Sequence, residues 1–394
     1  MVKIRSRSVR VIAAVASLAL LAPACGGDDE VAEESTKETA AEPAAEPAEE
    51  AADEPAEEPA EEPADEPAAE PAEEAADEAA DEPADVTPEV TSIATTCAPS
   101  FTYLGLQAAI AEDFFGDRGI SVECVQIGNG PELAAALIAG EAQFAGNIAF
   151  NIVPLVLQGF DLVAVHQLYD AMFFDVLVRA DFPLPNADGG WEAVMSDLVG
   201  SNVGVVARGV SAEDIARALF TGAGLDPDAQ TYIATGLAGP TVAALAAGEI
   251  DMAITFEPGL TSAVEDGIAV RPFSIAAGDG PSSVAFPSIH ETASREFVEA
   301  NPNTVCAFVR GLQDGAEFVK DPANRDAVIE LMQDKFSIAT PELAGAIYDA
   351  NIEYVAYQTP IDSAALDRVG QFLFDIGKVD RVVPAADYVV EPGC

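Results

Sequence analysis

Neutral side chains that can hydrogen-bond a small molecule follow several β-branched, apolar runs of the sequence. They are Ser100 and Thr102 after the run 91–97, Asn147 in the run 144–148, Ser211 after 203–206 and Thr241 after 231–234. Aromatic residues near the same places could form apolar walls. They are Phe101, Tyr103, Phe150, Tyr169 and Phe256, and each could equally be a core residue. This mixture predicts a binding site for a small molecule.

Arg208 is the only base in these loops and comes just before an expected helix start at Ser211. An anionic head group there would meet both a positive charge and free backbone donors. Arg208 has two other readings, a solvated loop arginine and a partner for a nearby acid. Glu257 follows an expected strand and has three readings: it holds a cationic group, pairs with Arg208 or faces water. Asp170 has the same alternative readings.

Catalytic patterns are not evident in the sequence. The two histidines, His166 and His290, are far apart in the chain, and no Ser-His-Asp order, HExxH, GxGxxG or P-loop is found. His166 lies inside an apolar run and is expected to be a buried core residue. We therefore expect no enzyme, no catalytic residue, no metal and no cofactor.

The elements that must position these residues alternate between strand and helix. Expected strands are 91–97, 120–127, 144–148, 162–168 and 174–179, with helices after the first at Leu104, after the second at Glu132 and after the third at Asn151. Such alternation is typical of βαβ units and predicts mostly parallel sheets covered on both faces.

A second module begins near Asp181. It contains the expected strands 203–206, 231–234 and 250–256, a helix opened by a Ser211–Asp214 capping box, and a helix with Pro240 at its first position. From Phe297 to about Asp375 the pattern becomes helical. This helical end can pack back on the first module and leave the second one inserted.

The first 24 residues have the parts of a secretory signal: a basic start, an apolar run from Val11 to Leu21 and then small residues. The run is shorter than the roughly 20 apolar residues that a membrane span needs. Residues 21–27, Leu-Ala-Pro-Ala-Cys-Gly-Gly, resemble a bacterial lipobox. That resemblance implies cleavage before Cys25 and lipidation of Cys25. The alternative is ordinary signal-peptidase cleavage.

An acidic, proline-rich segment follows, and residues 28–90 hold 27 acidic side chains and one lysine. Regular prolines and like charges prevent a core, so residues 25–90 are expected to be a lipidated cysteine and a disordered spacer. An adhesive or metal-buffering tail is the other reading. The whole chain of 394 residues has a net charge of −50, which repels phosphate backbones and excludes nucleic acid as a general partner.

Four cysteines remain when Cys25 is set aside, an even number that fits an oxidising compartment. No close CxxC pair supports zinc. Three pairings are possible. We predict Cys97–Cys124, because both fall on strands expected to be neighbours, and Cys306–Cys394, because that bridge would hold the C-terminus.

Three motifs in order resemble the nitrate/sulfonate/taurine and thiamine-precursor group of ABC-importer solute-binding proteins. They are residues 106–115 with 118–122, residues 197–200 before the strand 203–206, and residues 243–253 followed by Glu257-Pro258. The resemblance covers most of residues 91–394. It implies an α/β protein of the type II periplasmic-binding-protein fold, with two lobes joined by two crossing strands.

The expected organisation places residues 91–180 and 274–394 in lobe 1 and residues 181–273 in lobe 2, with crossings near 179–182 and 272–277. The resemblance implies a monomer that binds a sulfonate, nitrate, taurine-like or pyrimidine ligand and delivers it to an ABC permease from the outer face of the cell membrane. The expected ligand-binding residues are Ser100, Phe101, Tyr103, Asn147, Tyr169, Arg208, Ser211, Thr241 and Glu257. A secreted enzyme on the same fold and a ligand-binding sensor are the alternatives.

Overall fold

A computed structural model describes residues 87–126 and 130–394, which belong to one compact unit. The predicted signal segment, Cys25 and nearly all of the predicted spacer lie outside the described residues. Within the described residues, no helix is long and apolar enough to cross a membrane.

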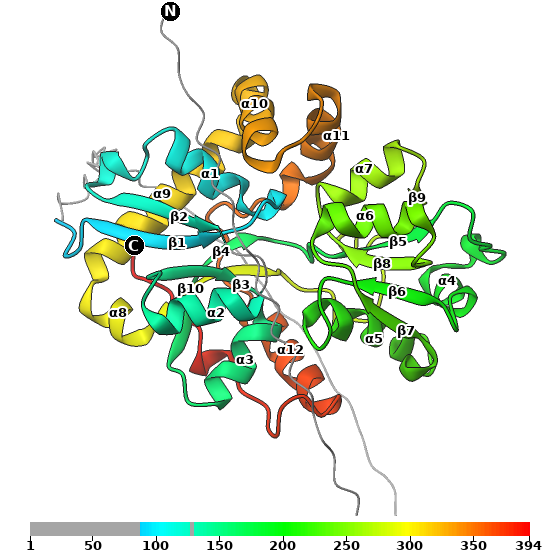
Figure 1. Ribbon diagram of the computed structural model, residues 1–394. Helices are drawn as coiled ribbons and strands as arrows, with labels where there is room; N and C mark the ends of the chain where they lie inside the picture. Colours follow the sequence, from blue (N-terminus) through cyan, green and yellow to red (C-terminus); the bar gives the residue numbers. More distant parts are fainter. Residues whose placement is uncertain (1–86, 127–129) are drawn as a thin grey trace, which may run out of the picture. The chain divides into compact units, whose positions relative to one another are not determined.

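The first sheet has five strands in the order β2-β1-β3-β10-β4 (Figure 1). Their bounds are β1 Ser92–Cys97, β2 Ser121–Gln126, β3 Phe144–Asn147, β4 Leu162–Tyr169 and β10 Ile289–Ser294. β1 runs parallel to β2 and β3, whereas β10 runs antiparallel to both β3 and β4. Every residue of β3 and β4 is buried, because helices cover both faces of this sheet. β10 has no counterpart among the strands expected from the sequence.

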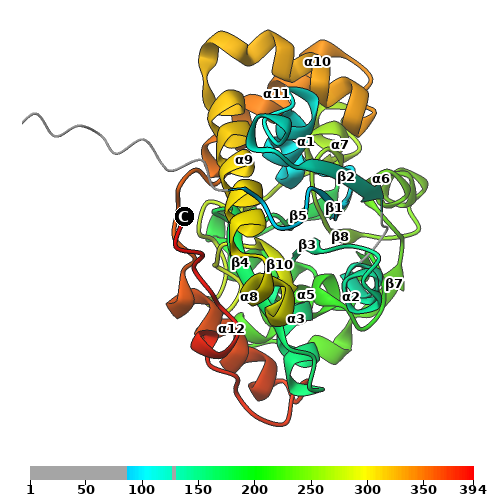
Figure 2. The ribbon, with the colours of Figure 1, turned by 90° about the vertical axis from the view of Figure 1, so that its left-hand side faces the viewer.

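Helices pack on the first sheet in two layers (Figures 1 and 2). α1 (Leu104–Ala111) and α9 (Pro302–Lys320) pack together on one side, and α2 (Gly130–Ala139), α3 (Ala149–Leu157) and α12 (Ser363–Asp375) lie on the other. Gly315 permits the α1–α9 contact, since a Cβ built on it would lie 2.2 Å from the Gly105 carbonyl oxygen. The remaining helices of this part are α8 (Arg295–Ala300), α10 (Arg325–Phe336) and α11 (Pro341–Asn351).

The second sheet has the strand order β7-β6-β8-β5-β9. Its strands are β5 Asp175–Arg179, β6 Asn202–Val205, β7 Thr231–Ala234, β8 Met252–Thr255 and β9 Ala269–Val270. β6 is parallel to β7 and β8, and β5 is antiparallel to β8 and β9. α4 (Trp191–Asp197) and α5 (Ser211–Gly222) pack together, as do α6 (Ala238–Ala247) and α7 (Gly259–Glu265).

The chain passes from the first sheet to the second between Tyr169 and Asp175, and returns between Val270 and Ile289. This differs from the expected first crossing near 179–182 and from the expected place of residues 174–179 in lobe 1. The strand itself is found, but β5 pairs with β8 in the second sheet. Asp175, the first residue of β5, is buried, and its carboxylate accepts a hydrogen bond from the Ile275 N–H at 3.1 Å. That long-range contact is invisible in the local pattern.

Two helix starts differ from their predictions. The N-cap of α5 is Val210, whose side chain makes no capping bond, and Ser211 is the first helical residue. Pro240 is the third residue of α6 and not the first. Proline is tolerated there because the N–H groups of a first turn have no acceptor inside the helix.

Both predicted disulfides are present. Cys97 is bonded to Cys124 and joins β1 to β2, and Cys306 in α9 is bonded to Cys394 at the C-terminus. The described chain begins against the same helix. The Glu89 carboxylate accepts hydrogen bonds from the N–H groups of Asn303 (3.2 Å) and Thr304 (2.8 Å) at the start of α9. Glu89 and Val90, assigned above to the spacer, therefore contact the folded part.

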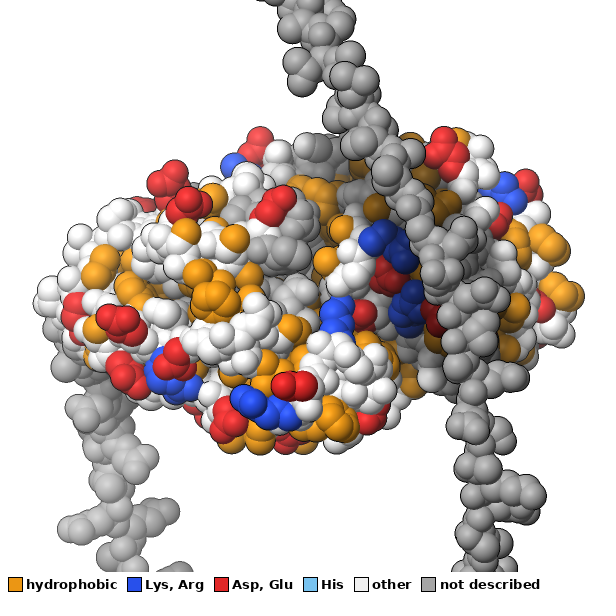
Figure 3. All heavy atoms as spheres, turned by 60° about the horizontal axis from the view of Figure 1, so that its bottom comes forward, with side chains coloured by type: hydrophobic (Ala, Val, Ile, Leu, Met, Phe, Trp, Pro, Cys, Tyr) orange, Lys and Arg blue, Asp and Glu red, His pale blue; other side chains and the backbone are white. Residues whose placement is uncertain are grey.

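Charged side chains are mixed on the surface. On the face shown in Figure 3, basic side chains stand beside acidic ones. Arg179 pairs with Asp181 at 2.9 Å, and Arg295 pairs with Asp161 at 2.9 Å. These partly exposed pairs contribute little stability individually, because water and salt screen them.

Candidate ligand-binding site

A cavity of about 90 Å³ lies where the strand ends of the two sheets face each other. The first sheet contributes the loop after β1, the end of β3 and the start of α3, and the second contributes the loops after β6, β7 and β8. Its described lining residues are Ala98, Ser100, Thr102, Tyr103, Leu133, Gly146, Asn147, Ile148, Asn151, Phe173, Phe174, Val206, Val210, Ser211, Leu237, Phe256 and Ile289. This is the edge at which α/β sheets bind ligands, and it draws residues from both lobes.

The walls are largely apolar, and the polar groups among the described lining residues are uncharged. Phe173 and Phe174 come from the crossing between β4 and β5, and Phe256 follows β8. The rings of Phe173 and Phe256 lie 5.6 Å apart. Phe173 and Phe174 were missed by the sequence analysis. The signal that could have found them is a pair of adjacent aromatic residues at the point where the chain leaves one sheet for the other.

Asn147 provides a hydrogen-bond donor that no other described residue uses. Its Oδ1 accepts from the Ile148 N–H at 3.0 Å and from Asn151 Nδ2 at 3.1 Å, which fixes the orientation of the amide. Its Nδ2 is buried and has no partner among residues 87–126 and 130–394. Because an unpaired buried donor costs free energy, a ligand acceptor at this place would be stabilised.

Ser211 stands at the N-terminus of α5 and is buried. The first N–H groups of a helix lack acceptors inside the helix, and the helix dipole makes this end electropositive. On the opposite lobe, the hydroxyl groups of Ser100 and Thr102 lie 3.1 Å apart and hydrogen-bond each other. The cavity can therefore hold a polar head group with neutral donors.

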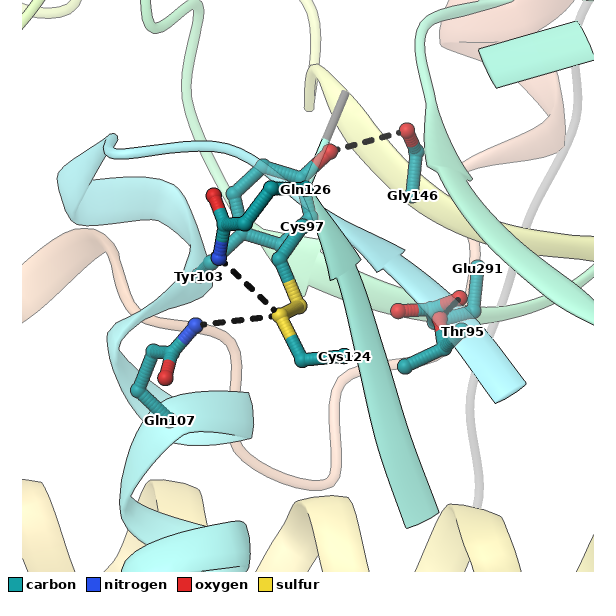
Figure 4. The surroundings of a disulfide bond; sticks show 8 residues. All are labelled: Thr95, Cys97, Tyr103, Gln107, Cys124, Gln126, Gly146 and Glu291. Atoms are coloured by element: carbon teal, nitrogen blue, oxygen red, sulfur yellow. Dashed lines mark hydrogen bonds between the residues drawn. A yellow bond between two sulfur atoms is a disulfide. The ribbon is translucent and has the colours of Figure 1, made fainter. Parts of the chain in front are cut away.

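Tyr103 covers the end of β3 (Figure 4). Its hydroxyl donates to the Gly146 carbonyl oxygen at 2.9 Å. Burial raises the pKa of this phenol, and the nearby Glu291 carboxyl raises it further, so Tyr103 stays protonated. Glu291 is fully buried in β10 and accepts from the Thr95 hydroxyl at 3.3 Å. Burial raises the pKa of Glu291 to about 8, although the bond from Thr95 opposes the shift.

A second, smaller cavity of about 10 Å³ adjoins the first. Its lining residues are Ser100, Phe101, Thr102, Tyr169, Phe173, Phe256, Glu257 and Asn351. Four of them, Ser100, Thr102, Phe173 and Phe256, also line the main cavity, so the two spaces share a wall. Asn351, at the end of α11, was not expected at the site.

The structure brings seven of the nine expected ligand-binding residues to these cavities. Ser100, Tyr103, Asn147 and Ser211 line the main cavity, and Ser100, Phe101, Tyr169 and Glu257 line the smaller one. Arg208 and Thr241 line neither. The Thr241 hydroxyl lies 2.7 Å from the Thr235 hydroxyl and 3.2 Å from the Leu237 carbonyl oxygen, so it holds the start of α6.

Arg208 is directed away from the cavity by a local acid. Its Nε donates to Glu213 at 2.7 Å and its Nη1 donates to the Tyr232 carbonyl oxygen at 2.9 Å. Burial alone would raise the pKa of Glu213, but hydrogen bonds from Arg208, the Gly209 N–H and Arg217 offset it and lower that pKa to about 2. Pairing with a nearby acid, the alternative reading of Arg208, is what the structure shows.

Four other residues considered above line neither cavity. The Phe150 ring stacks on Phe286, with centroids 5.5 Å apart. Asp170 accepts from the Thr359 hydroxyl at 3.1 Å. His166 is buried in β4 as expected, and burial lowers its pKa to about 4. His290 is buried in β10, and burial also lowers its pKa to about 4.

A family model described as NMT1/THI5 like matches residues 100–324. This match confirms the resemblance drawn from the three motifs. No match was found among curated protein sequences.

Solved structures of binding proteins share the fold of this chain. The alkanesulfonate-binding protein SsuA from Xanthomonas axonopodis pv. citri, bound to MOPS, is 18% identical with a TM-score of 0.65, over 77% of this chain and 99% of that one. The periplasmic aliphatic sulphonate binding protein SsuA from Escherichia coli is 15% identical with a TM-score of 0.62, over 75% and 96%.

The periplasmic nitrate-binding protein NrtA from Synechocystis PCC 6803 is 14% identical with a TM-score of 0.54, over 66% of this chain and 70% of that one. Together these likenesses confirm the predicted type II periplasmic-binding-protein fold of two α/β lobes.

Proposed function

We propose that the chain, which belongs to the NMT1/THI5-like family, is an extracytoplasmic solute-binding protein that captures one small molecule between its two lobes for an ABC importer. The observation that carries the proposal is the main cavity. Strand ends of both sheets line it, and the Asn147 Nδ2 in its wall is a buried donor without a partner. Such a wall stabilises a ligand that offers an acceptor to this donor.

The lobes in this proposal follow the sheets. Lobe 1 contains the first sheet with its helices, lobe 2 contains residues 175–270, and the segments 170–174 and 271–288 connect them. Closure of the two lobes on the ligand removes it from water, and this strengthens each hydrogen bond inside.

The ligand we propose is a small organic molecule with an apolar body and one polar head group. The phenylalanine rings suit the body, and hydroxyl, amide and helix N-terminal donors suit the head. Sulfonates, nitrate, taurine-like compounds and pyrimidines all remain test compounds. A dianion is disfavoured, because the described lining residues offer no cation to balance it.

For the rest of the chain we propose a secreted, membrane-anchored monomer. The signal peptide 1–24 directs export, Cys25 carries the lipid, and residues 25 to about 88 act as the spacer. A multiply acylated cysteine holds a protein at a membrane much more firmly than a single chain does. Cell fractionation of the Cys25→Ser variant tests this. Equal membrane retention of variant and parent would exclude the lipid anchor.

The binding role is tested by a thermal-shift screen of these compound classes, followed by calorimetry on the hits. Asn147→Asp keeps the acceptor that bonds to the Ile148 N–H and replaces the free donor by a carboxylate oxygen, which repels an acceptor on the ligand. We expect it to weaken binding of the hit by about ten- to a hundred-fold, since the donor is buried. Circular dichroism checks that the variant is folded. A complete lack of binding by the parent, or full affinity in the variant, would contradict the proposal.

A further inference from the structure

Glu257 is a buried carboxylate that lacks a counter-ion of its own. It follows β8, and only 5% of its surface is exposed. Its oxygens accept from the Thr261 N–H at 3.0 Å, from the Thr261 hydroxyl at 2.7 Å and from Asn351 Nδ2 at 3.5 Å. All three donors are neutral, and no described lysine or arginine forms an ion pair with it.

Arg271, the cation whose electric field reaches Glu257, already forms an ion pair with another acid. Arg271 affects Glu257 only through its longer-range field, and its guanidinium is paired with the buried Asp175 carboxylate. Removing a carboxylate from water without a direct cationic partner costs several kcal/mol. A cation brought by a ligand would offset that cost.

The space beside Glu257 fits a compact cation. The smaller cavity, of about 10 Å³, has room for about one water-sized group. Aromatic rings form most of its remaining wall, and they are Phe101, Tyr169, Phe173 and Phe256. The faces of aromatic rings attract cations, most strongly when water is excluded. The Glu257 carboxylate repels an anion from the same space.

The position of this space also fits one end of a ligand. It lies next to the main cavity and shares Ser100, Thr102, Phe173 and Phe256 with it. Its walls come from both lobes: Glu257 and Phe256 from the second, and Tyr169 and Asn351 from the first. The Tyr169 hydroxyl donates to Asn351 Oδ1 at 3.3 Å, which leaves the hydroxyl oxygen able to accept.

We propose that the smaller cavity is a subsite for a primary ammonium group, and that the ligand is a small organic amine whose ammonium pairs with Glu257 while its apolar body fills the main cavity. This inference rests on the proposed function and narrows its ligand class. Lobe closure would complete the subsite, since the carboxylate and the Tyr169 ring approach the ammonium from opposite lobes.

Matched pairs of an amine and its alcohol test the subsite, because they differ chiefly in the charged head. We would titrate benzylamine against benzyl alcohol, and 2-phenylethylamine against 2-phenylethanol, by calorimetry with the protein that lacks the signal peptide. Each amine is expected to bind at least tenfold more tightly than its alcohol. Glu257→Gln should remove that preference. Glu265→Gln, the same charge change at an exposed position of α7, should preserve it.

The outcomes separate this inference from the proposed function. If amine and alcohol bind equally, or if neither binds, the ammonium subsite is wrong. The solute-binding proposal then still stands or falls with the broader screen and Asn147→Asp. If Glu257→Gln does not fold, the difference in affinity between amine and alcohol in the parent protein tests the subsite by itself. Retention of the preference in a folded Glu257→Gln variant would also overturn the subsite.

Discussion

The Tyr103 phenol lies directly over Gly146, to whose carbonyl oxygen it donates a hydrogen bond of 2.9 Å (Figure 4). A Cβ at Gly146 would lie 2.6 Å from the Tyr103 ring. The contact thus joins the turn after β1 to the end of β3, and both residues line the main cavity. Glycine is required here by the close approach of the ring.

Gly146→Ala should therefore displace the Tyr103 ring and reshape the cavity. We expect ligand affinity to fall by about tenfold or more, while the fold persists, because overpacking typically costs 1–3 kcal/mol. Calorimetry with the hit from the screen measures the effect. Tyr103→Phe is the matched control, since it removes the hydroxyl but leaves the ring in place. Parental affinity in Gly146→Ala would show that the cavity tolerates movement of this ring.

Gly315→Ala should destabilise the protein through the α1–α9 contact. The added methyl would meet the Gly105 carbonyl oxygen at 2.2 Å, and backbone cannot move aside as a side chain can. We expect the free energy of unfolding to fall by about 2–3 kcal/mol in urea titrations. Gly239→Ala is the control, because nothing lies within 4 Å of a Cβ at that position of α6. Equal stability of the two variants would contradict the packing argument.

Arg208→Ala should leave ligand affinity within about twofold of the parent, because the guanidinium is held by Glu213 and lies outside both cavities. The variant should instead be less stable than the parent near neutral pH, and this difference should shrink in acid. The folded pKa of Glu213, about 2, is below its unfolded value, so this stabilisation is present above about pH 4.5 and is lost as pH falls toward 2. A tenfold loss of affinity would place Arg208 in the binding site after all.

Glu291 should make the protein less stable as pH rises. Its folded pKa of about 8 is above the unfolded value, so between about pH 4.5 and 8 the folded state holds a proton that the unfolded state has released. Stability therefore falls across this range. The histidines act oppositely, since their folded pKa values near 4 give stability that is lost as pH falls below about 6.5.

The interval from pH 6.5 to 8 separates the Glu291 contribution from that of the histidines. Over that interval the parent should lose about 1–2 kcal/mol of unfolding free energy. Glu291→Gln mimics the protonated acid and should remove this slope. Urea titrations at pH 6.5, 7.2 and 8 measure it. An unchanged slope in the variant would assign the pH dependence to another group.

The order of elements could be predicted from the sequence because most of them carry a local signal. β1 and β6 are short β-branched runs, and α9 and α12 show a helical period. β10 could not be predicted, because His290, Glu291 and Thr292 are polar and become strand residues only by pairing with β3 and β4. Its formation depends on partners far away in the chain.

The site could be predicted where a side chain that can hydrogen-bond lies at or just after the end of a strand. Ser100, Asn147 and Ser211 follow that rule and line the cavity. Arg208 was predicted to bind the ligand because of its charge. Its guanidinium instead pairs with Glu213, in the first turn of the next helix. Phe173 was hidden because its place depends on where the chain leaves the first sheet, which is a property of the sheet pairing and not of the local sequence.

Both ends of the described chain are fastened to the first turns of one helix, α9. Glu89 holds the N–H groups of Asn303 and Thr304, and Cys306 is bonded to Cys394. A pulling force applied at Glu89 would therefore enter the first lobe directly. The second lobe lies outside this load path, because the chain reaches it only through the two connecting segments. Such a force would leave the two connecting segments unstrained, so the proposed closure of the lobes on a ligand would not depend on it.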